Sequence, residues 1–212
     1  MKKFLVAIMA VLMAAPSVAQ TGSGGFTFSE SSVYYGLRLG VNFAGIGGDY
    51  GDHIDLGTKT GMNLGAVVGL RLSETTPVFL ESGLYYTERG AKKDKAKVGL
   101  TYFEVPLLIK YGIQATDDIA VLPYVGPYFS YGIAGKFKNP SEIDENGNGY
   151  NRSSYKRFKH WDMGFKVGCG AEYNKLYAEL GYQFGVANIA KENPADLDAS
   201  GHALYFNIGV NF

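Results

Sequence analysis

The stretch YYGLRLGVNF, residues 34–43, alternates strictly between two kinds of residue. Every second position is apolar, and the positions between are small or polar: Tyr35, Leu37, Leu39, Val41 and Phe43 alternate with Tyr34, Gly36, Arg38, Gly40 and Asn42. This period of two predicts a β-strand whose two faces meet different environments. A soluble sheet would put the leucines inward and Arg38 in water. A membrane barrel would put the leucines toward lipid and Arg38 toward a wet interior.

The same alternation recurs along the chain, so that eight strands are predicted. They cover residues 33–43, 61–72, 78–87, 100–111, 121–133, 161–173, 176–186 and 203–212. Soluble strands usually have about 5 or 6 residues, whereas a tilted membrane strand needs about 9 to 11. The length of the segments therefore favours the bilayer. Pro123 and Pro127 weaken the fifth segment, because each removes a donor from the strand ladder.

Composition bounds the remaining choices. The chain has 212 residues, 29 Gly, 16 Tyr and 13 Phe, which fits one domain built from many strands and tight turns. Its 20 basic and 20 acidic residues cancel, so net charge gives no reason to expect a nucleic-acid partner. The single cysteine, Cys169, excludes an internal disulfide.

The first residues predict a cleaved signal peptide over residues 1–19. Two lysines at positions 2 and 3 precede an apolar run over residues 4–15, and small residues follow up to Ala19. The run is too short to span a bilayer comfortably, which takes about 20 residues; an uncleaved anchor is the alternative. Residues 20–31 are predicted to be a flexible periplasmic lead, and residues 32–212 the barrel.

The connections between the predicted strands alternate in length. Short ones cover residues 73–77, 113–119 and 174–175, and longer ones cover 44–60, 88–99, 134–160 and 187–202. Outer-membrane barrels have short periplasmic turns and long extracellular loops. With the N-terminus on the periplasmic side, all the long connections fall outside the cell.

Charge and glycine share one face of the predicted strands. That face carries Arg38, Arg71, Glu81, Glu104, Lys110, Asp162, Lys166, Glu172 and Glu179. Glycine weakens a strand by about 0.5–1 kcal/mol relative to alanine, but a narrow barrel interior needs small residues beside long ones. A charge on the lipid face would cost about 2–4 kcal/mol at the midplane, and the other face carries none. We therefore predict an all-β, eight-stranded antiparallel transmembrane up-and-down β-barrel with these nine residues as a charge network in its lumen.

Four stretches carry a resemblance to a known family: GLRLGVNFAG at 36–45, YFEVPLLIKYG at 102–112, PYVGPYFSYG at 123–132 and NIGVNF at 207–212. In this order they resemble the small outer-membrane β-barrel family abundant in Bacteroidetes, often labelled porin-like. The resemblance implies a place in the cell outer membrane. It also implies that the terminal aromatic residue, Phe212, is the signal recognised by the barrel-assembly machinery.

Two acidic loops are candidate cation sites. The sequence DENGNG at 144–149 matches the opening of an EF-hand loop, but Tyr155 stands where that loop needs a bidentate glutamate. Asp49, Asp52, His53 and Asp55 are close in sequence, but a solvated loop explains them as well. No metal and no cofactor is predicted.

A basic stretch precedes the sixth strand and comprises Arg152, Lys156, Arg157, Lys159 and His160. It fits either lipopolysaccharide phosphates or a solvated face. Some eight-stranded barrels edit lipid A with a histidine, a serine and a carboxylate. Here His160, His202, Ser153 and Ser154 are linked by no motif, and no enzyme activity is predicted.

The predicted function is a structural or interaction role in contact with outer-membrane lipid and lipopolysaccharide. The long loops 44–60, 134–160 and 187–202 would bind an unknown protein or glycan. A small porin for ions or solutes is the alternative, ranked lower because the lumen of an eight-stranded barrel is usually filled by side chains. A lipid A-modifying enzyme is the third hypothesis.

Overall fold

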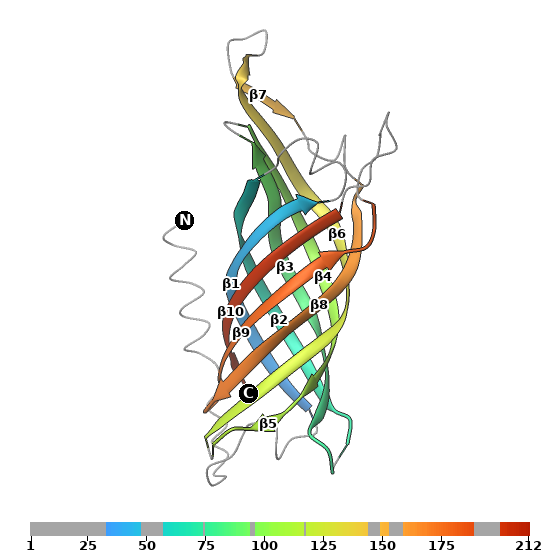
Figure 1. Cartoon of the computed structure of the whole chain (residues 1–212), viewed down its shortest axis with the longest axis vertical. Helices are drawn as coiled ribbons and strands as arrows, with labels where there is room; N and C mark the ends of the chain where they lie inside the picture. The colour runs from blue at the N-terminus through green and yellow to red at the C-terminus, as the bar shows by residue number, and fades with distance from the viewer. Residues whose placement is uncertain are drawn as a thin grey trace.

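Eight long antiparallel strands wind around a common axis in the computed structural model (Figure 1). The structure describes residues 33–47, 57–73, 75–93, 96–116, 118–143, 149–152, 159–188 and 200–212. The strands are β1 (Val33–Gly47), β2 (Gly57–Arg71), β3 (Val78–Lys93), β4 (Ala96–Tyr111), β6 (Ile119–Ile143), β8 (Trp161–Tyr173), β9 (Leu176–Gly185) and β10 (Ser200–Asn211). Across these described ranges, no helix is long and apolar enough to cross a membrane.

The strands form one closed barrel. Each strand pairs with its neighbours in the order β4-β3-β2-β1-β10-β9-β8-β6, and a pairing between β4 and β6 closes the circle. At the junction of the first and last strands, the Tyr35 amide donates to the Phe212 carbonyl and the Phe212 amide donates to the Tyr35 carbonyl, each at 2.9 Å. Closure leaves these eight strands without the free edges that open sheets must protect. The predicted fold class is confirmed.

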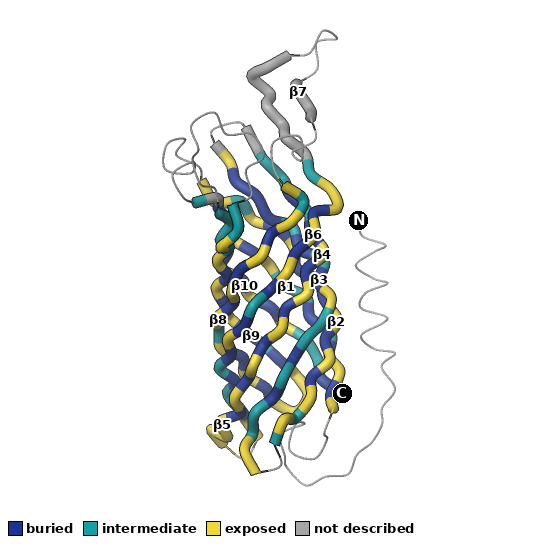
Figure 2. Tube along the Cα trace, turned by 90° about the vertical axis from the view of Figure 1, so that its right-hand side faces the viewer, coloured by how far each residue is buried: buried dark blue, intermediate teal, exposed yellow. Residues whose placement is uncertain are grey.

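The two faces of the barrel wall differ as the alternation predicts. Buried and exposed residues alternate along the strands (Figure 2), and in β8 the pattern holds over almost the whole strand. Leu37, Leu39 and the other aliphatic residues on their face point outward, while Arg38 is 1% exposed and lies inside. The opening stretch is therefore a barrel strand with its leucines on the outer surface.

The two ends of the barrel differ. The turn end carries the short connections at residues 72–77, 112–118 and 174–175, and the loop end is the opposite one. At the turn end Asn174 and Lys175 both have positive φ, 43° and 71°, which suits the tight two-residue hairpin between β8 and β9. A two-residue strand, β5 (Ile113–Gln114), pairs with β6 inside the connection predicted as 113–119.

Several strands run further toward the loop end than the sequence indicates. β3 and β4 occupy most of 88–99, and β6 continues to Ile143, where it pairs with the short β7 (Gly149–Arg152) inside the predicted loop 134–160. β1 and β2 likewise enter 44–60, and β10 begins at Ser200. The loop boundaries were wrong because these extensions carry few apolar residues, so their alternation is weak, although their ladder pairing continues.

The two prolines of the fifth predicted strand are accommodated within β6. Pro123 and Pro127 keep their pairings with Cys169 and Phe165 on β8. On the β4 side the register runs from Pro106–Tyr128 to Ile109–Val125 without the pairs between, as expected where a proline supplies no amide. Residues 1–31, and with them the predicted signal peptide and lead, lie outside the described residues.

Candidate functional site: the lumen charge network

The barrel interior collects the charged side chains that the sequence places on one face. Eight of the nine are at most 4% exposed: Arg38, Glu81, Glu104, Lys110, Asp162, Lys166, Glu172 and Glu179. The ninth, Arg71, is half-buried at the turn end of β2, where its Nε donates to the Ser73 carbonyl at 2.9 Å. Every second side chain of each strand points into the lumen. Residues from distant parts of the sequence therefore meet in one narrow space.

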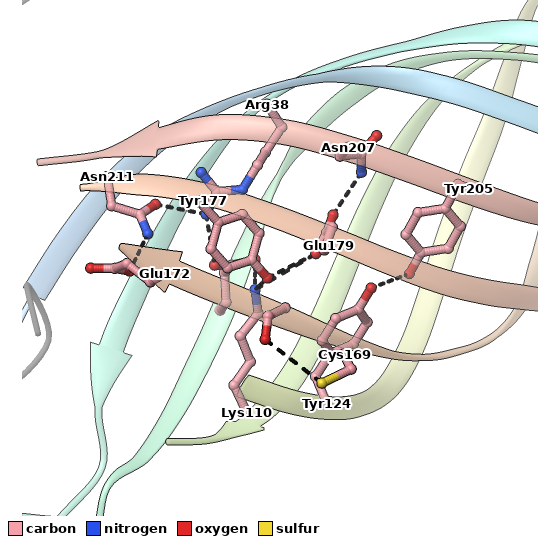
Figure 3. Close-up of polar contacts among 12 residues, drawn as sticks. Arg38, Lys110, Tyr124, Cys169, Glu172, Tyr177, Glu179, Tyr205, Asn207 and Asn211 are labelled. Carbon is pink, nitrogen blue, oxygen red and sulfur yellow. Dashed lines mark hydrogen bonds and ion pairs between the residues drawn. The ribbon is translucent and has the colours of Figure 1, made fainter. Parts of the chain in front are cut away.

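The turn-end cluster consists of Arg38, Glu81, Lys110, Glu172 and Glu179 and is shown in part in Figure 3. Glu81 on β3 is its centre. Its Oε1 lies 2.8 Å from the Lys110 ammonium, and its Oε2 lies 3.6 Å from the Arg38 guanidinium. The Tyr34 hydroxyl donates to Oε2 at 2.7 Å. A buried carboxylate with this many partners is compensated for its lost hydration.

Glu179 on β9 gives Lys110 a second carboxylate at 4.0 Å. Tyr177 connects them, because its hydroxyl accepts from Lys110 at 2.8 Å and donates to Glu179 at 2.9 Å. The Asn207 amide donates to the other Glu179 oxygen at 2.6 Å. Lys110 and Glu179 are therefore each held by more than one contact (Figure 3).

The remaining members of the cluster reach the closing seam of the barrel. Arg38 donates to the Asn211 oxygen at 2.7 Å, and the Asn211 amide donates to Glu172 at 2.6 Å. The Arg38 guanidinium also lies 3.9 Å from the centre of the Tyr177 ring, a cation–π arrangement. The network thus links strands β1, β3, β4, β8, β9 and β10 across the lumen.

A tyrosine layer separates this cluster from the next one. Tyr124 on β6 and Tyr205 on β10 have their hydroxyls 2.9 Å apart, and Leu108 packs with them as one buried group. Glycines make room for these rings: a Cβ on Gly168 would lie 2.4 Å from the Tyr124 hydroxyl. The layer fills the middle of the lumen.

The loop-end cluster consists of Arg89, Glu104, Asp162 and Lys166. Glu104 on β4 forms ion pairs with both Arg89 on β3 and Lys166 on β8. Arg89 also bonds Asp162 at 2.7 Å, to which the Tyr128 hydroxyl donates at 3.2 Å. Glu104 is 0% exposed and Lys166 is 3% exposed, so both charges are shielded from bulk solvent.

Sequence analysis missed Arg89. It falls in 88–99, which was predicted as a loop, yet the structure places it on β3, 5% exposed and in the centre of the loop-end cluster. The signal was present, because Arg89 continues the inward parity of Glu81, Tyr85 and Thr87. Extending the period of two past Tyr86 would have found it.

The contacts described in the lumen hold the strands of the barrel to one another. Within the described ranges, no group of three or more His, Cys, Asp or Glu residues could hold a metal ion. The acidic loop residues Asp49, Asp52, His53 and Asp55, and most of 144–149, lie outside those ranges. Cys169 is exposed on the outer face. The lumen charges form ion pairs with one another and hydrogen bonds with tyrosine and asparagine side chains.

The fold and its filled interior define the class of protein. A family model described as "Outer membrane protein beta-barrel domain" matches residues 18–191, so the chain belongs to that family and is an outer-membrane β-barrel protein of the small, eight-stranded type.

Solved structures of small outer-membrane barrels are similar to this chain. A major outer membrane protein from Thermus thermophilus aligns with a TM-score of 0.52 and 14% identity, covering 86% of this chain and 100% of that one. Neisserial surface protein A aligns at 0.47 and 15%, covering 86% and 98%. Ail, the attachment invasion locus protein of Yersinia pestis, aligns at 0.43 and 12%, covering 86% and 100%. At these identities the Thermus protein supports the fold alone. A search of the curated proteins gives no match.

Proposed function

We propose that this protein is a non-conducting outer-membrane barrel whose loop end faces the cell exterior and binds a protein or glycan partner. The observation that supports the proposal is the filled lumen. Side-chain contacts reach across the lumen between non-adjacent strands at two levels, from β4 to β9 through Lys110 and Tyr177 and from β3 to β8 through Arg89 and Asp162, with the Tyr124–Tyr205 layer between them. A pore would need a continuous water path past side chains that are almost wholly buried.

The rival hypothesis is a small porin, and single-channel recording separates the two. The purified barrel is reconstituted in planar bilayers beside a large general porin as the positive control. We expect a silent membrane. A matched variant, Tyr124→Ala with Tyr205→Ala, removes the tyrosine layer and reports whether that layer is the barrier. Steady, reproducible conductance from the unmodified protein would establish the porin instead.

Orientation is tested on intact cells. Outer-membrane barrels place long loops outside and short turns inside, so an epitope inserted between Asn146 and Gly147 should be labelled without permeabilisation. The same epitope between Asn174 and Lys175 should be labelled only after permeabilisation. The reverse result would place the loops in the periplasm and end the proposed role in surface interaction.

We also propose that the chain reaches the membrane after cleavage behind Ala19, and that Phe212 is recognised by the barrel-assembly machinery. N-terminal sequencing of the mature protein should begin at Gln20. Deleting Phe212 should lower the amount assembled in the membrane, and Phe212→Tyr should retain it. The relationship to the barrels abundant in Bacteroidetes remains a prediction from the four resembling stretches.

Enzyme activity is not part of the proposal. His160 lies against Tyr131 and His202 lies against Tyr182, and Ser153 and Ser154 lie outside the described residues. Mass spectrometry of lipid A from cells with and without the protein tests this. We expect identical spectra, and a mass change that depends on His160 or His202 would establish the lipid-editing enzyme.

A further inference from the structure

Three aromatic and imidazole rings gather on the outer surface at the loop end of β6 and β8. Tyr131 is the middle one: His160 stacks on it with ring centres 5.7 Å apart, and Trp161 meets it edge-on at 4.9 Å. Trp161 is 67% exposed and Tyr131 is 46% exposed. Such a surface is hydrophobic on one side and polar on the other, as at a lipid–water boundary.

The imidazole of His160 is held in place by the neighbouring strand. The Gly132 amide donates to the His160 carbonyl at 2.6 Å, and His160 Nδ1 lies 2.8 Å from the Gly132 carbonyl oxygen. Because a carbonyl oxygen only accepts, Nδ1 carries the proton and donates. The ring is therefore fixed against Tyr131 before any ligand arrives, which lowers the entropic cost of binding.

Charge at this position is positive. Lys159 precedes the imidazole and is exposed. The carboxylate of Glu88 lies beside Tyr86 on β3, and β4 lies between β3 and the β6 strand that carries Tyr131. Below the rings, Met163 and Phe165 are 46% and 44% exposed on the lipid face. The chain therefore has an exposed lysine directly before the imidazole of this ring group, and apolar side chains follow on the outer face of β8.

We propose that Tyr131, Lys159, His160 and Trp161 form a binding site for the phosphate-bearing headgroup of an outer-leaflet lipid. The Lys159 ammonium contacts the phosphate through a charge-assisted hydrogen bond, and the imidazole of His160, held by its hydrogen bond to Gly132, lines the site beside it. Trp161 and Tyr131 sit at the level of the headgroup, and the acyl chains pack on Met163 and Phe165. The orientation given under the proposed function determines only that the lipid belongs to the outer leaflet. The contacts with the phosphate do not depend on that orientation.

The chain supplies its own matched control. His202 stacks on Tyr182 with ring centres 6.4 Å apart and 28° between planes, so a second imidazole–tyrosine pair lies at the loop end of β9 and β10. Its neighbours in sequence are Gly201 and Ala203, so that pair lacks an adjacent lysine. If the cation next to the rings is what selects phosphate, this second pair should not select it.

Intrinsic fluorescence measures binding at this site directly, because Trp161 is the only tryptophan in the chain. The folded protein in a neutral detergent is titrated with bisphosphorylated lipid A and with dephosphorylated lipid A. We expect Trp161 emission to respond to the phosphorylated lipid at about tenfold lower concentration. The double variant Lys159→Gln/His160→Gln should lose that preference, and His202→Gln should keep it.

Three results would overturn the site: equal response to both lipids, an unchanged preference in the double variant, or displacement of the lipid by excess inorganic phosphate, which would indicate an ion site only. Folding of each variant is checked by heat-dependent gel mobility. If the double variant fails to fold, the comparison of the two lipids on the unmodified protein still decides. The titration in micelles does not depend on conductance or on loop orientation. The lipid site can therefore fail its test while the proposed function stands, and the proposed function can fail while the lipid site stands.

Discussion

The two charge clusters of the lumen use the same residue types but differ in redundancy. In the turn-end cluster Lys110 has two carboxylates, Glu81 at 2.8 Å and Glu179 at 4.0 Å. In the loop-end cluster Glu104 is the one carboxylate that the described structure brings within ion-pair distance of Lys166, and Glu104 also holds Arg89. Lys110 in the turn-end cluster therefore has two carboxylate partners, whereas Lys166 in the loop-end cluster depends on Glu104 alone.

Packing is also tighter around the turn-end cluster than around the loop-end cluster. A Cβ on Gly69 would lie 2.0 Å from the Tyr34 ring, beside the turn-end cluster, whereas a Cβ on Gly201 would be 3.9 Å from Asp162, its nearest neighbour in the loop-end cluster. The turn end is filled by aromatic rings that leave no space. The loop end retains some room beside its carboxylate.

The largest expected effect comes from Glu104→Ala. This variant leaves Lys166 buried without a carboxylate and takes one of two carboxylates from Arg89, so we expect a loss of about 3–5 kcal/mol in unfolding free energy. Urea unfolding in lipid vesicles, followed by Trp161 fluorescence, measures it. The exposed Asp118→Ala at the turn end is the control and should change stability by less than about 0.5 kcal/mol.

Glu81→Ala is the counterpart in the turn-end cluster. Lys110 keeps Glu179 and Tyr177, and Arg38 keeps Asn211. We therefore expect a smaller loss, about 2 kcal/mol, measured in the same vesicles. If Glu81→Ala proves as costly as Glu104→Ala, redundancy of partners does not govern the stability of this lumen.

The difference between the clusters also shows how far the sequence alone leads. The alternation of β1 and β8 determines both the fold and the inward direction of Arg38 and Lys166, because a strand with period two has only two faces. It predicts which residues share the lumen. It does not predict partners, since pairing depends on the register and stagger of eight strands around the barrel.

Arg89 illustrates the limit at the loop end. Beyond the apolar belt the outward positions of β3 are Glu88 and Lys92, which no longer contrast with a polar interior. The hydrophobic pattern stops there, but backbone pairing does not, because ladder hydrogen bonds need no apolar side chain. The centre of the loop-end cluster was therefore assigned to a loop.

Gly69→Ala and Gly201→Ala compare the packing of the two ends directly. Gly69→Ala must displace the Tyr34 ring and with it the hydrogen bond to Glu81, so we expect a loss of about 1–3 kcal/mol from overpacking. Gly201→Ala has room for its methyl group and should be near neutral. Equal losses would mean that the free space around each glycine does not set the cost of replacing it.

The smallest expected effect lies in the tyrosine layer between the clusters. Tyr124→Phe or Tyr205→Phe removes one hydroxyl of the pair that are 2.9 Å apart, and each should cost about 1 kcal/mol. The double variant leaves no unsatisfied partner, so its loss should be less than the sum of the two single losses. Urea titration of all four proteins completes this double-mutant cycle. Strict additivity would show that each hydroxyl has another partner of equal worth, and that the two clusters are not joined through this bond.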